Sequence, residues 1–574
     1  MEQTKLTGYP SIDKPWLKYY SEEAINAPLP ECTMYEAALS GNEEHLDKVI
    51  FEFYGRKITA KQFFDRVDDV AAALTSLSIK HGDTVTICML NTPETVYLMY
   101  AINKIGAIAN LLCPVSPKEE LLHDINLCKS EVLFTLDIFQ DKMLEIIDNT
   151  CIKRVVVAKL KQSMSLPFRI AVTIIKKQKS IPLAEDLRFL TWNHFMKHKD
   201  YSFVVNHDTK DVAAIVYTGG TTGGSKGVAL TNYSIVATAW QYIHGGADIE
   251  RNDTWAEVLP LFIAYGVSCA LQIPLMVGIK IHLRLPMTDT IDQLARFRPN
   301  HIMSGPDSWN QLAELAKDID LSFLKEPISG GDTLPVPVEQ KVNSYLNKQG
   351  SKYPLMNGYG MSEVCAAVSC NNIRIHKEGT VGIPFVKNIV SAFDIDTQEE
   401  KKTGEEGELC ICTPSMMWGY VNNKAETENI ARKHSDGKVW IHTGDLGFID
   451  EDGFIHINGR LKRYLMRYWS DGVKKIFCPD IERHLIKCPI IENCVIVPVT
   501  ADLGQAPHAY VILKDKSMPK KEAVDAIKGY CEQKIGEVYR PDSFTIVQNY
   551  PHTKVGKIDY RALEERAAKE YMEK

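Results

Sequence analysis

The chain has 574 residues, and because a single hydrophobic core does not grow to that size, two or more domains are expected. Its apolar fraction of 45% and charged fraction of 24% are those of a soluble globular protein, and the net charge of -7 disfavours a nucleic-acid binder, which needs a basic surface. The 14 cysteines include no CxxC pair, and the N-terminal stretch lacks the apolar core of a signal peptide. We therefore expect reduced thiols in a cytoplasmic protein.

The N-terminal half alternates helical and strand patterns. Residues 58–77 predict an amphipathic helix, and residues 84–90 predict the buried strand that follows it. A second helix is expected to begin at Pro93, with Thr92 as its cap, and strands are expected near 131–137 and 154–159. The stripe of the first helix consists of Phe63, Phe64, Val67, Val70, Ala71 and Leu74. Strand, helix and strand in succession predict an α/β fold with parallel strands.

Two segments depart from this alternation. Residues 153–200 are basic with interleaved apolar side chains, and they predict a solvated insertion with a small hydrophobic foot; peripheral contact with an anionic membrane is the alternative. Residues 258–279 carry no charge and are long enough to span a bilayer. Proline and glycine interrupt them, so a buried helix with flanking strands is favoured.

The C-terminal part of the chain has a different pattern of predicted strands and helices. Strand patterns at 494–500 and 508–515 precede a helical pattern at 520–536 and a charged terminal helix. These elements predict a small α+β domain of about a hundred residues.

The loop "YTGGTTGGSKGV" at 217–228 is rich in glycine, hydroxyls and one lysine. The pattern GxxxxGK[ST] does not fit it, because Ser225 stands where the lysine of that pattern belongs. Exposed backbone N–H groups, the hydroxyls of Thr218, Thr221 and Thr222, and the cation of Lys226 nevertheless suit a polyphosphate.

This loop resembles the phosphate loop of the adenylate-forming superfamily, which includes acyl-CoA synthetases, firefly luciferases and adenylation domains. Gly219 and Ser225 replace its usual serine and proline. Further stretches similar to family motifs follow in order over nearly the whole chain: "LPLF" at 259–262, "SGGDTLP" at 329–335, "NGYGMSE" at 357–363, "WIHTGDLG" at 440–447, "NGRLK" at 458–462 and "PHTKVGKIDYRAL" at 551–563. The chain looks most like a stand-alone fatty acid:CoA ligase.

The resemblance implies an ATP site. Tyr359 would stack on adenine, Asp445 and Arg460 would hold the ribose, and Glu363 would bind the Mg²⁺ that bridges the phosphates. The implied nucleotide-binding residues are Thr218, Gly219, Gly220, Thr221, Thr222, Gly331, Asp332, Thr333, Asn357, Gly358, Tyr359, Gly360, Ser362, Asp445 and Arg460.

The resemblance also implies the chemistry and the domains. A large domain (1–458) would be followed by a small mobile domain (459–574) that turns about a hinge at Lys462. Lys557 would be the catalytic lysine, with Glu363 and Lys226 assisting it, and the product would be an acyl-adenylate and then a thioester.

The acid is inferred from the segment "LPLFIAYGVS", which offers no carboxylate to pair with an ammonium group, so an α-amino acid is disfavoured. A medium- or long-chain fatty acid is the first choice, with an aryl or branched acid as alternatives. The residues expected around the acyl group are Phe262, Ile263, Gly331, Gly358 and Met361.

The acceptor thiol stays open between CoA and a carrier protein, because the segment 460–479 is longer than in relatives and lacks their glycine pair. Its basic residues Arg463, Arg467, Lys474 and Lys475 suit either CoA phosphates or an acidic carrier protein. A noncatalytic sensor is disfavoured, since Lys557 and Glu363 are both retained.

Overall fold

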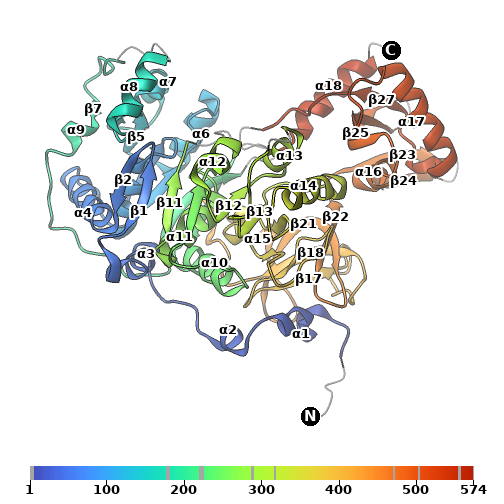
Figure 1. The fold of residues 1–574 in the computed structure, drawn as a ribbon, viewed down its shortest axis with the longest axis horizontal. Coiled ribbons are helices and arrows are strands. Elements are labelled where there is room, and N and C mark those ends of the chain that lie inside the picture. The colour runs from blue at the N-terminus through green and yellow to red at the C-terminus, as the bar shows by residue number, and fades with distance from the viewer. Residues whose placement is uncertain are drawn as a thin grey trace.

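Figure 1 shows a large domain, coloured blue to orange, and a smaller red domain at the C-terminal end that stands to one side of it. The predicted fold class, a large α/β domain with parallel-containing sheets followed by a small α+β domain, is confirmed. The computed structural model describes residues 6–175, 181–218, 225–285, 290–315, 318–469, 472–501, 504–553 and 557–572.

The first large sheet has nine strands, and its central strands are parallel. Its strands, in spatial order, are β16 (Ile383–Pro384), β15 (Ser369–Cys370), β14 (Met356–Tyr359), β13 (Glu326–Ser329), β12 (His301–Ser304), β10 (Thr254–Glu257), β11 (Lys280–Leu283), β1 (Val49–Phe53) and β2 (Arg56–Thr59). Parallel strands bring their carboxyl ends to one edge of a sheet, where ligand sites of α/β proteins lie.

The second large sheet has eight strands. In spatial order they are β19 (Gly419–Tyr420), β9 (Lys226–Thr231), β8 (Val212–Thr218), β4 (Ile108–Leu111), β3 (Thr84–Cys88), β5 (Val132–Leu136), β6 (Arg154–Ala158) and β7 (Phe189–Thr191). Strands β3 to β8 are parallel, whereas β8 and β9 form an antiparallel hairpin around the glycine-rich loop. The predicted strands near 84–90, 131–137 and 154–159 are confirmed.

Helices fill the space between the two large sheets, because the main apolar core takes side chains from both sheets and from the helices between them. These helices are α3 (Met34–Ser40), α4 (Ala60–Ser76), α5 (Pro93–Lys104), α10 (Asn232–His244), the π-helix η5 (Tyr265–Leu271) and α11 (Gln272–Val277). The predicted apolar stripe of α4 is buried, and the Thr92 side chain caps α5 by accepting from the Thr95 N–H over 3.3 Å. Both predictions are confirmed.

Further helices cover the outer faces of the large sheets. The outer core of the first sheet includes apolar side chains of α12 (Thr290–Phe297), α13 (Pro306–Leu315) and α14 (Val336–Lys348). The corresponding core on the second sheet includes α6 (Lys118–Cys128) and α7 (Gln140–Ile146). Short helices α1 (Pro10–Asp13), α2 (Glu22–Asn26), α8 (Leu166–Ile175), α9 (Trp192–Phe195) and α15 (Lys424–Ile430) complete the large domain.

The third sheet carries the chain to the small domain. Its strands are β17 (Ile389–Phe393), β18 (Gly407–Cys412), β21 (Val439–Ile449), β20 (Ala431–Lys433) and β22 (Ile455–Arg460). In the pairing of β21 with β22, Asp445 lies opposite Arg460. The chain then leaves this sheet through the turn at Leu461 and Lys462.

The small domain has a hairpin, a three-stranded sheet and three helices. The hairpin joins β23 (Tyr464–Trp469) to β24 (Gly472–Phe477), and the sheet contains β25 (Ile491–Thr500), β26 (Gln505–Leu513) and β27 (Ser543–Ile546). The helices are α16 (Cys478–Leu485), α17 (Lys520–Lys534) and α18 (Tyr560–Met572). The two predicted strands and the two predicted helices are confirmed, and the structure shows that the strands pair in antiparallel fashion.

The two segments that departed from the alternation are now placed. The uncharged run 258–279 contains η5 and α11, and strands β10 and β11 flank it, as predicted. Among the described residues, no helix combines the length and the apolarity that a membrane span requires. The basic segment 153–200 is more than an insertion, because it supplies β6 and the edge strand β7. All 14 cysteines are unpaired.

Candidate functional site

The glycine-rich loop connects β8 to β9, and the last residue of β8, Thr218, pairs with the first residue of β9, Lys226. Four of the predicted nucleotide-binding residues, Gly219, Gly220, Thr221 and Thr222, lie outside the described residues. The described ends of the loop therefore lie opposite each other on paired strands.

Lys226 and the predicted metal ligand Glu363 share one neighbour, Tyr420 of β19. The Lys226 ammonium group lies 5.1 Å from the centre of the Tyr420 ring and pairs with the Glu426 carboxylate. The Tyr420 hydroxyl donates to Oε1 of the buried Glu363 over 2.7 Å. Tyr420 thus links the phosphate-loop lysine to the predicted metal ligand, although neither it nor Glu426 was predicted as a site residue.

The predicted nucleotide turns follow the carboxyl ends of β13 and β14. Gly331 has a φ of +88°, a backbone conformation that favours glycine, and Asp332 accepts the Thr333 N–H over 2.8 Å. Asn357, Gly358 and Tyr359 end the adjacent strand β14. A Cβ at Gly360 would lie 1.6 Å from the carbonyl oxygen of Ala366, so the chain needs glycine there. Ser362 then opens the 3-10 turn that carries Glu363.

The ribose-binding residues predicted from the sequence contact one another. The Tyr359 hydroxyl donates to Oδ2 of Asp445 over 2.5 Å, and the Arg460 Nε lies 2.9 Å from its Oδ1. Burial raises the pKa of Asp445, although the Arg460 cation and the Tyr359 hydrogen bond oppose this shift. Burial also raises the pKa of Tyr359, so its hydroxyl keeps its proton. The structure therefore holds a preformed hydrogen-bond acceptor beside the predicted adenine platform.

Lys557 comes from the small domain and lies beside this group. The N–H of the next residue, Ile558, donates to Oδ2 of Asp332 over 3.0 Å, and His552 of the same loop pairs with Asp307. Burial lowers the pKa of Lys557, while the Asp332 carboxylate opposes the shift most strongly. The charges of Arg460, Glu363 and Asp445 also act on its ammonium group. The side chain remains in contact with solvent even though protein atoms surround it.

The residues predicted around the acyl group do not all share one environment. Phe262 is buried in the core between the two large sheets, and Ile263 packs against the same core. Met361 packs on the core of the third sheet, whereas Gly331 faces the ring of Tyr265 at 4.0 Å from its Cδ1. A Cβ at Gly358 would lie 3.3 Å from the Cys370 Sγ. Tyr265, which was not predicted as a site residue, thus lies next to the turn at Gly330 and Gly331.

The segment 460–479 forms a hairpin, and its arginines are held within the small domain. Arg463 pairs with Glu482 at 2.5 Å, and Arg467 pairs with Asp542 at 2.5 Å and donates to two carbonyl oxygens. The Lys475 ammonium group lies 4.4 Å from the centre of the Tyr464 ring. Phosphate groups that bind Arg463 or Arg467 would therefore have to compete with these partners inside the small domain.

Two comparisons of the sequence fix the family. The family model described as AMP-binding enzyme matches residues 39–421, and the model of the AMP-binding enzyme C-terminal domain matches residues 480–557. The chain belongs to the AMP-binding enzyme family. This confirms the resemblance to the adenylate-forming superfamily, and the two matches fall within the two domains of this AMP-binding enzyme.

Curated relatives cover nearly the whole AMP-binding enzyme. A long-chain-fatty-acid–CoA ligase of Bacillus subtilis is 28% identical over 568 residues, which cover 96% of this chain and 97% of the relative. A probable 4-coumarate–CoA ligase of Dictyostelium discoideum is 27% identical and covers 88% of this chain and 91% of its own length. A solved anthranilate–CoA ligase with anthranoyl-AMP has a TM-score of 0.80 at 21% identity, covering 96% of this chain and all (100%) of its own. That last likeness supports the fold alone.

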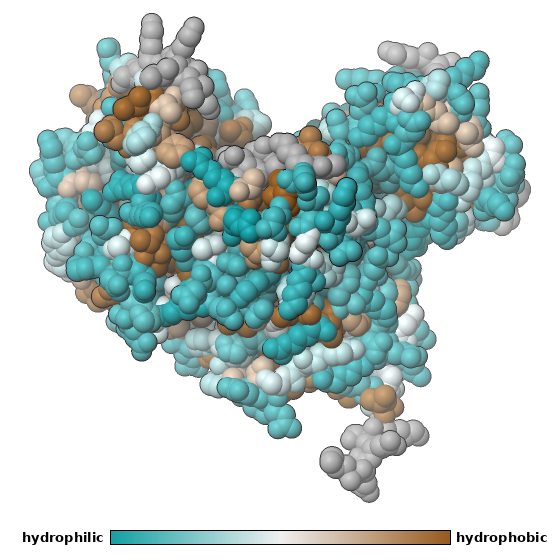
Figure 2. All heavy atoms as spheres, in the orientation of Figure 1, coloured by the Kyte–Doolittle hydropathy of each residue, from teal (hydrophilic) through white to brown (hydrophobic). Residues whose placement is uncertain are grey.

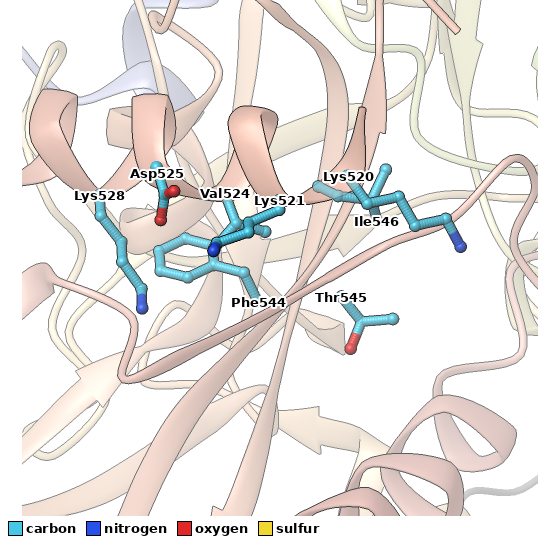
Figure 3. Close-up of a pocket in the computed structure, with 8 residues that line it drawn as sticks. All are labelled: Lys520, Lys521, Val524, Asp525, Lys528, Phe544, Thr545 and Ile546. Atoms are coloured by element: carbon cyan, nitrogen blue, oxygen red, sulfur yellow. The ribbon is translucent and has the colours of Figure 1, made fainter. Parts of the chain in front are cut away.

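The small domain of this AMP-binding enzyme carries a groove apart from the predicted site (Figure 3). It lies between α17 and β27, and Figure 3 shows lysine side chains spread along it with the Phe544 ring among them. Its lining residues are Lys520, Lys521, Val524, Asp525, Lys528, Phe544, Thr545 and Ile546. Three lysines against one aspartate give the groove a basic character.

Proposed function

We propose that this enzyme is an AMP-forming acid:CoA ligase. It joins a carboxylic acid to ATP with release of pyrophosphate, and then transfers the acyl group from AMP to CoA. The observation that carries the proposal is the position of Lys557, which the small domain presents to Asp332, Asp445 and Glu363 of the large domain.

The first half-reaction brings together two anions, the carboxylate and the α-phosphate of ATP. The Lys557 ammonium group reduces their repulsion, and Asp445 with Arg460 fixes the ribose so that the phosphate stays in line. Lys226, with its glycine-rich loop, receives the departing pyrophosphate. To do so, its ammonium group exchanges the Glu426 carboxylate for phosphate oxygens.

The residues present fit a divalent cation at Glu363. Its carboxylate is buried, and its Oε1 accepts from Tyr420, a hydrogen bond that orients the group. Among the described residues, no partner is recorded for Oε2, which suits a hard cation such as Mg²⁺. When bound, that cation withdraws charge from the phosphates.

A medium- or long-chain fatty acid is the proposed substrate, supported by the fatty-acid–CoA ligases among the relatives and by the apolar surroundings of the segment after Pro260. An aryl acid is the second candidate, which the 4-coumarate–CoA ligases among the relatives favour. A branched acid is the third candidate substrate.

CoA is the proposed acceptor, and a carrier protein is the alternative. The groove of three lysines on the small domain favours that alternative, because an acidic protein surface would complement it.

The test is pyrophosphate exchange into ATP across saturated, unsaturated, aryl and branched acids, followed by AMP release with and without CoA. We expect exchange with fatty acids and a CoA-dependent rise in AMP release. Absence of exchange with every acid would overturn the proposed function. Exchange without any effect of CoA would move the acceptor to a carrier protein.

Peripheral membrane contact through α8 is also proposed. The side chains of Leu166 and Ile170 are 66% and 50% exposed, while Phe168 packs on Tyr54 as the predicted hydrophobic foot. Figure 2 shows brown atoms gathered where α7 and α8 lie in Figure 1. Sedimentation with anionic vesicles should recover the wild type and lose the Leu166→Asp/Ile170→Asp variant, whereas Val204→Asp, on an exposed residue elsewhere, should sediment normally.

A further inference from the structure

Glu257 is a buried carboxyl group whose side-chain oxygens form no well-formed hydrogen bond with the described residues. It is the last residue of β10 and has no exposed surface, at 0%. Neither Oε1 nor Oε2 forms a hydrogen bond with any part of the chain that the structure describes. A buried polar group in this condition destabilises the fold, and an apolar residue would serve the core better. The burial of the Glu257 carboxyl group therefore indicates a role other than packing.

The direction of the Glu257 side chain follows from the sheet. Side chains alternate along a strand, so Glu257 lies on the same face as Trp255, which packs in the core formed with η5 and α11. Strand β10 also contacts η5 directly. In the next strand, Glu257 pairs with Leu283, an apolar residue of the core between the sheets. The carboxyl group thus points into the layer between the sheet and η5.

The helix that faces Glu257 is unusual in geometry. Residues Tyr265–Leu271 form a π-helix, a rare structure that occurs frequently at functional sites. Tyr265 and Cys269 lie on its side toward Glu257, since the charge of that carboxylate acts on both groups. An unpaired carboxyl group and an irregular helix therefore meet in one place.

Tyr265 connects this place to the proposed reaction site. A Cβ at Gly330 would lie 3.0 Å from the Tyr265 hydroxyl oxygen, and one at Gly331 would lie 4.0 Å from its ring. These glycines precede Asp332, to which the Lys557 loop binds. Tyr265 therefore borders both the glycine turn beside the Lys557 loop and the layer that holds Glu257. If an acyl chain extends past Tyr265 from a carboxylate held near Lys557, it reaches this layer.

Burial raises the pKa of Glu257 well above its ordinary value. The Leu259 backbone N–H lies near the carboxyl group and opposes this shift in part, although the contact lacks the geometry of a well-formed hydrogen bond. Burial therefore favours the neutral form of this carboxyl group. A neutral carboxyl group donates one hydrogen bond and accepts others, which matches a hydroxyl group better than it matches a cation.

We propose that Glu257 binds a hydroxyl group on the acyl chain, so that the preferred substrate is a hydroxylated acid. This inference rests on the proposed acid:CoA ligase function and refines its substrate. The segment "LPLFIAYGVS", which offers no carboxylate, begins two residues after Glu257 and so does not include this carboxyl group. A site that offers a buried polar group rejects an acid that cannot pair with it, because that group then stays unsatisfied.

The experiment compares matched acids in pyrophosphate exchange without CoA. The pairs are dodecanoic acid with a series of hydroxydodecanoic acids that differ in hydroxyl position, and cinnamic acid with its ring-hydroxylated forms. We expect the wild type to show a kcat/KM at least about tenfold higher for one hydroxylated member than for its parent. Glu257→Leu should reverse this preference, and Glu257→Gln, which still donates and accepts, should keep part of it.

Thermal unfolding separates this role from a structural one. Glu257→Leu should unfold at the wild-type temperature or above it, because the change removes a buried unsatisfied group. The proposal is overturned if Glu257→Leu slows hydroxylated and parent acids by the same factor, or if ω-aminododecanoic acid is preferred to its hydroxyl counterpart. If no acid supports exchange in the wild type, the proposed function fails instead.

Discussion

The backbone N–H of Ile558 in the small domain donates to Oδ2 of Asp332 in the large domain over 3.0 Å. Because Ile558 directly follows Lys557, this hydrogen bond fixes how far the catalytic ammonium group reaches. The turn that carries Asp332 also borders Tyr265. Asp332 therefore positions the small domain next to both the proposed nucleotide site and the proposed acyl site.

Replacing Asp332 should slow adenylate formation selectively. Asp332→Ala removes the acceptor of the Ile558 N–H, and we expect pyrophosphate exchange to fall by about tenfold or more. Thioester formation from supplied acyl-adenylate should not change. Lys516→Ala, which removes an exposed interdomain ion pair with Glu314 at 3.3 Å, should change exchange less than about twofold. Equal losses in both half-reactions would contradict this role of Asp332.

The fall of the pyrophosphate exchange rate at alkaline pH should report the loss of the proton from Lys557. Burial lowers the pKa of Lys557 from 10.5, and the nearby Asp332, Glu363 and Asp445 carboxylates oppose the shift while Arg460 adds to it. The ammonium form is present below the folded pKa, so the rate should fall as pH rises through that lowered value. Asp332→Asn should move this fall to lower pH, because it removes a charge that retains the proton. Profiles of kcat/KM against pH that coincide for the two proteins would argue against the assignment.

Removal of the ammonium group itself gives the sharpest division of the two steps. Lys557→Ala should reduce pyrophosphate exchange by about 10²–10³-fold, the usual effect of losing one group that stabilises charge in a transition state. Conversion of supplied acyl-adenylate to thioester should remain largely intact. Lys569→Ala, on the exposed side of the terminal helix, serves as the control.

A rigid residue at the hinge should impair the second step. Leu461 is held to the large domain, since its N–H donates to the Gly444 carbonyl oxygen over 2.7 Å, so Lys462 is the first residue after this anchor. Lys462→Pro restricts the φ angle that has to change when the small domain turns. We expect CoA-dependent turnover to fall more than pyrophosphate exchange. Lys462→Ala should preserve both, and normal turnover of the proline variant would exclude a hinge at this residue.

The local elements could be predicted from the sequence because their signals are local. The capping threonines and apolar stripes of α4 and α5 lie within one segment each. The contact of Lys226 with Glu426 joins residues far apart in the chain, and no periodicity reports it. The π-helix and the isolation of Glu257 also depend on how the sheet packs on η5. The motifs singled out Tyr359, Asp445, Arg460 and Lys557 from the sequence, whereas the contacts of Asp445 with Tyr359 and Arg460 required the fold.

A buried histidine should make stability depend on pH. His301 lies between Asp253 at 2.9 Å and Glu326 at 3.0 Å. Burial alone would lower the pKa of His301, but the hydrogen bonds to these two carboxylates outweigh it and raise the pKa. Its stabilising contribution is therefore present in full below about pH 6.5, the unfolded value, and is lost as pH rises through the raised folded value.

Thermal unfolding between pH 6 and pH 9 checks this histidine. His301→Gln should lose about 3 kcal/mol at low pH, because it leaves two buried carboxylates without their cation, and its unfolding temperature should fall less as the pH rises. His198→Gln, on an exposed side chain, should follow the wild type at every pH. If the unfolding temperature of His301→Gln changes with pH in the same way as that of the wild type, the proposed charge on His301 is refuted.

Strand β22 ends at Arg460, so this arginine is fastened to the large domain by its pairing with Asp445, one residue before the chain enters the hinge turn. The ribose grip and the mobile lysine are therefore on opposite sides of the pivot. If the small domain turns at the proposed hinge, an acyl-adenylate stays held by its ribose while the face that Lys557 covered opens to the incoming thiol. One binding pocket can in this way serve two successive reactions without releasing a labile anhydride into water.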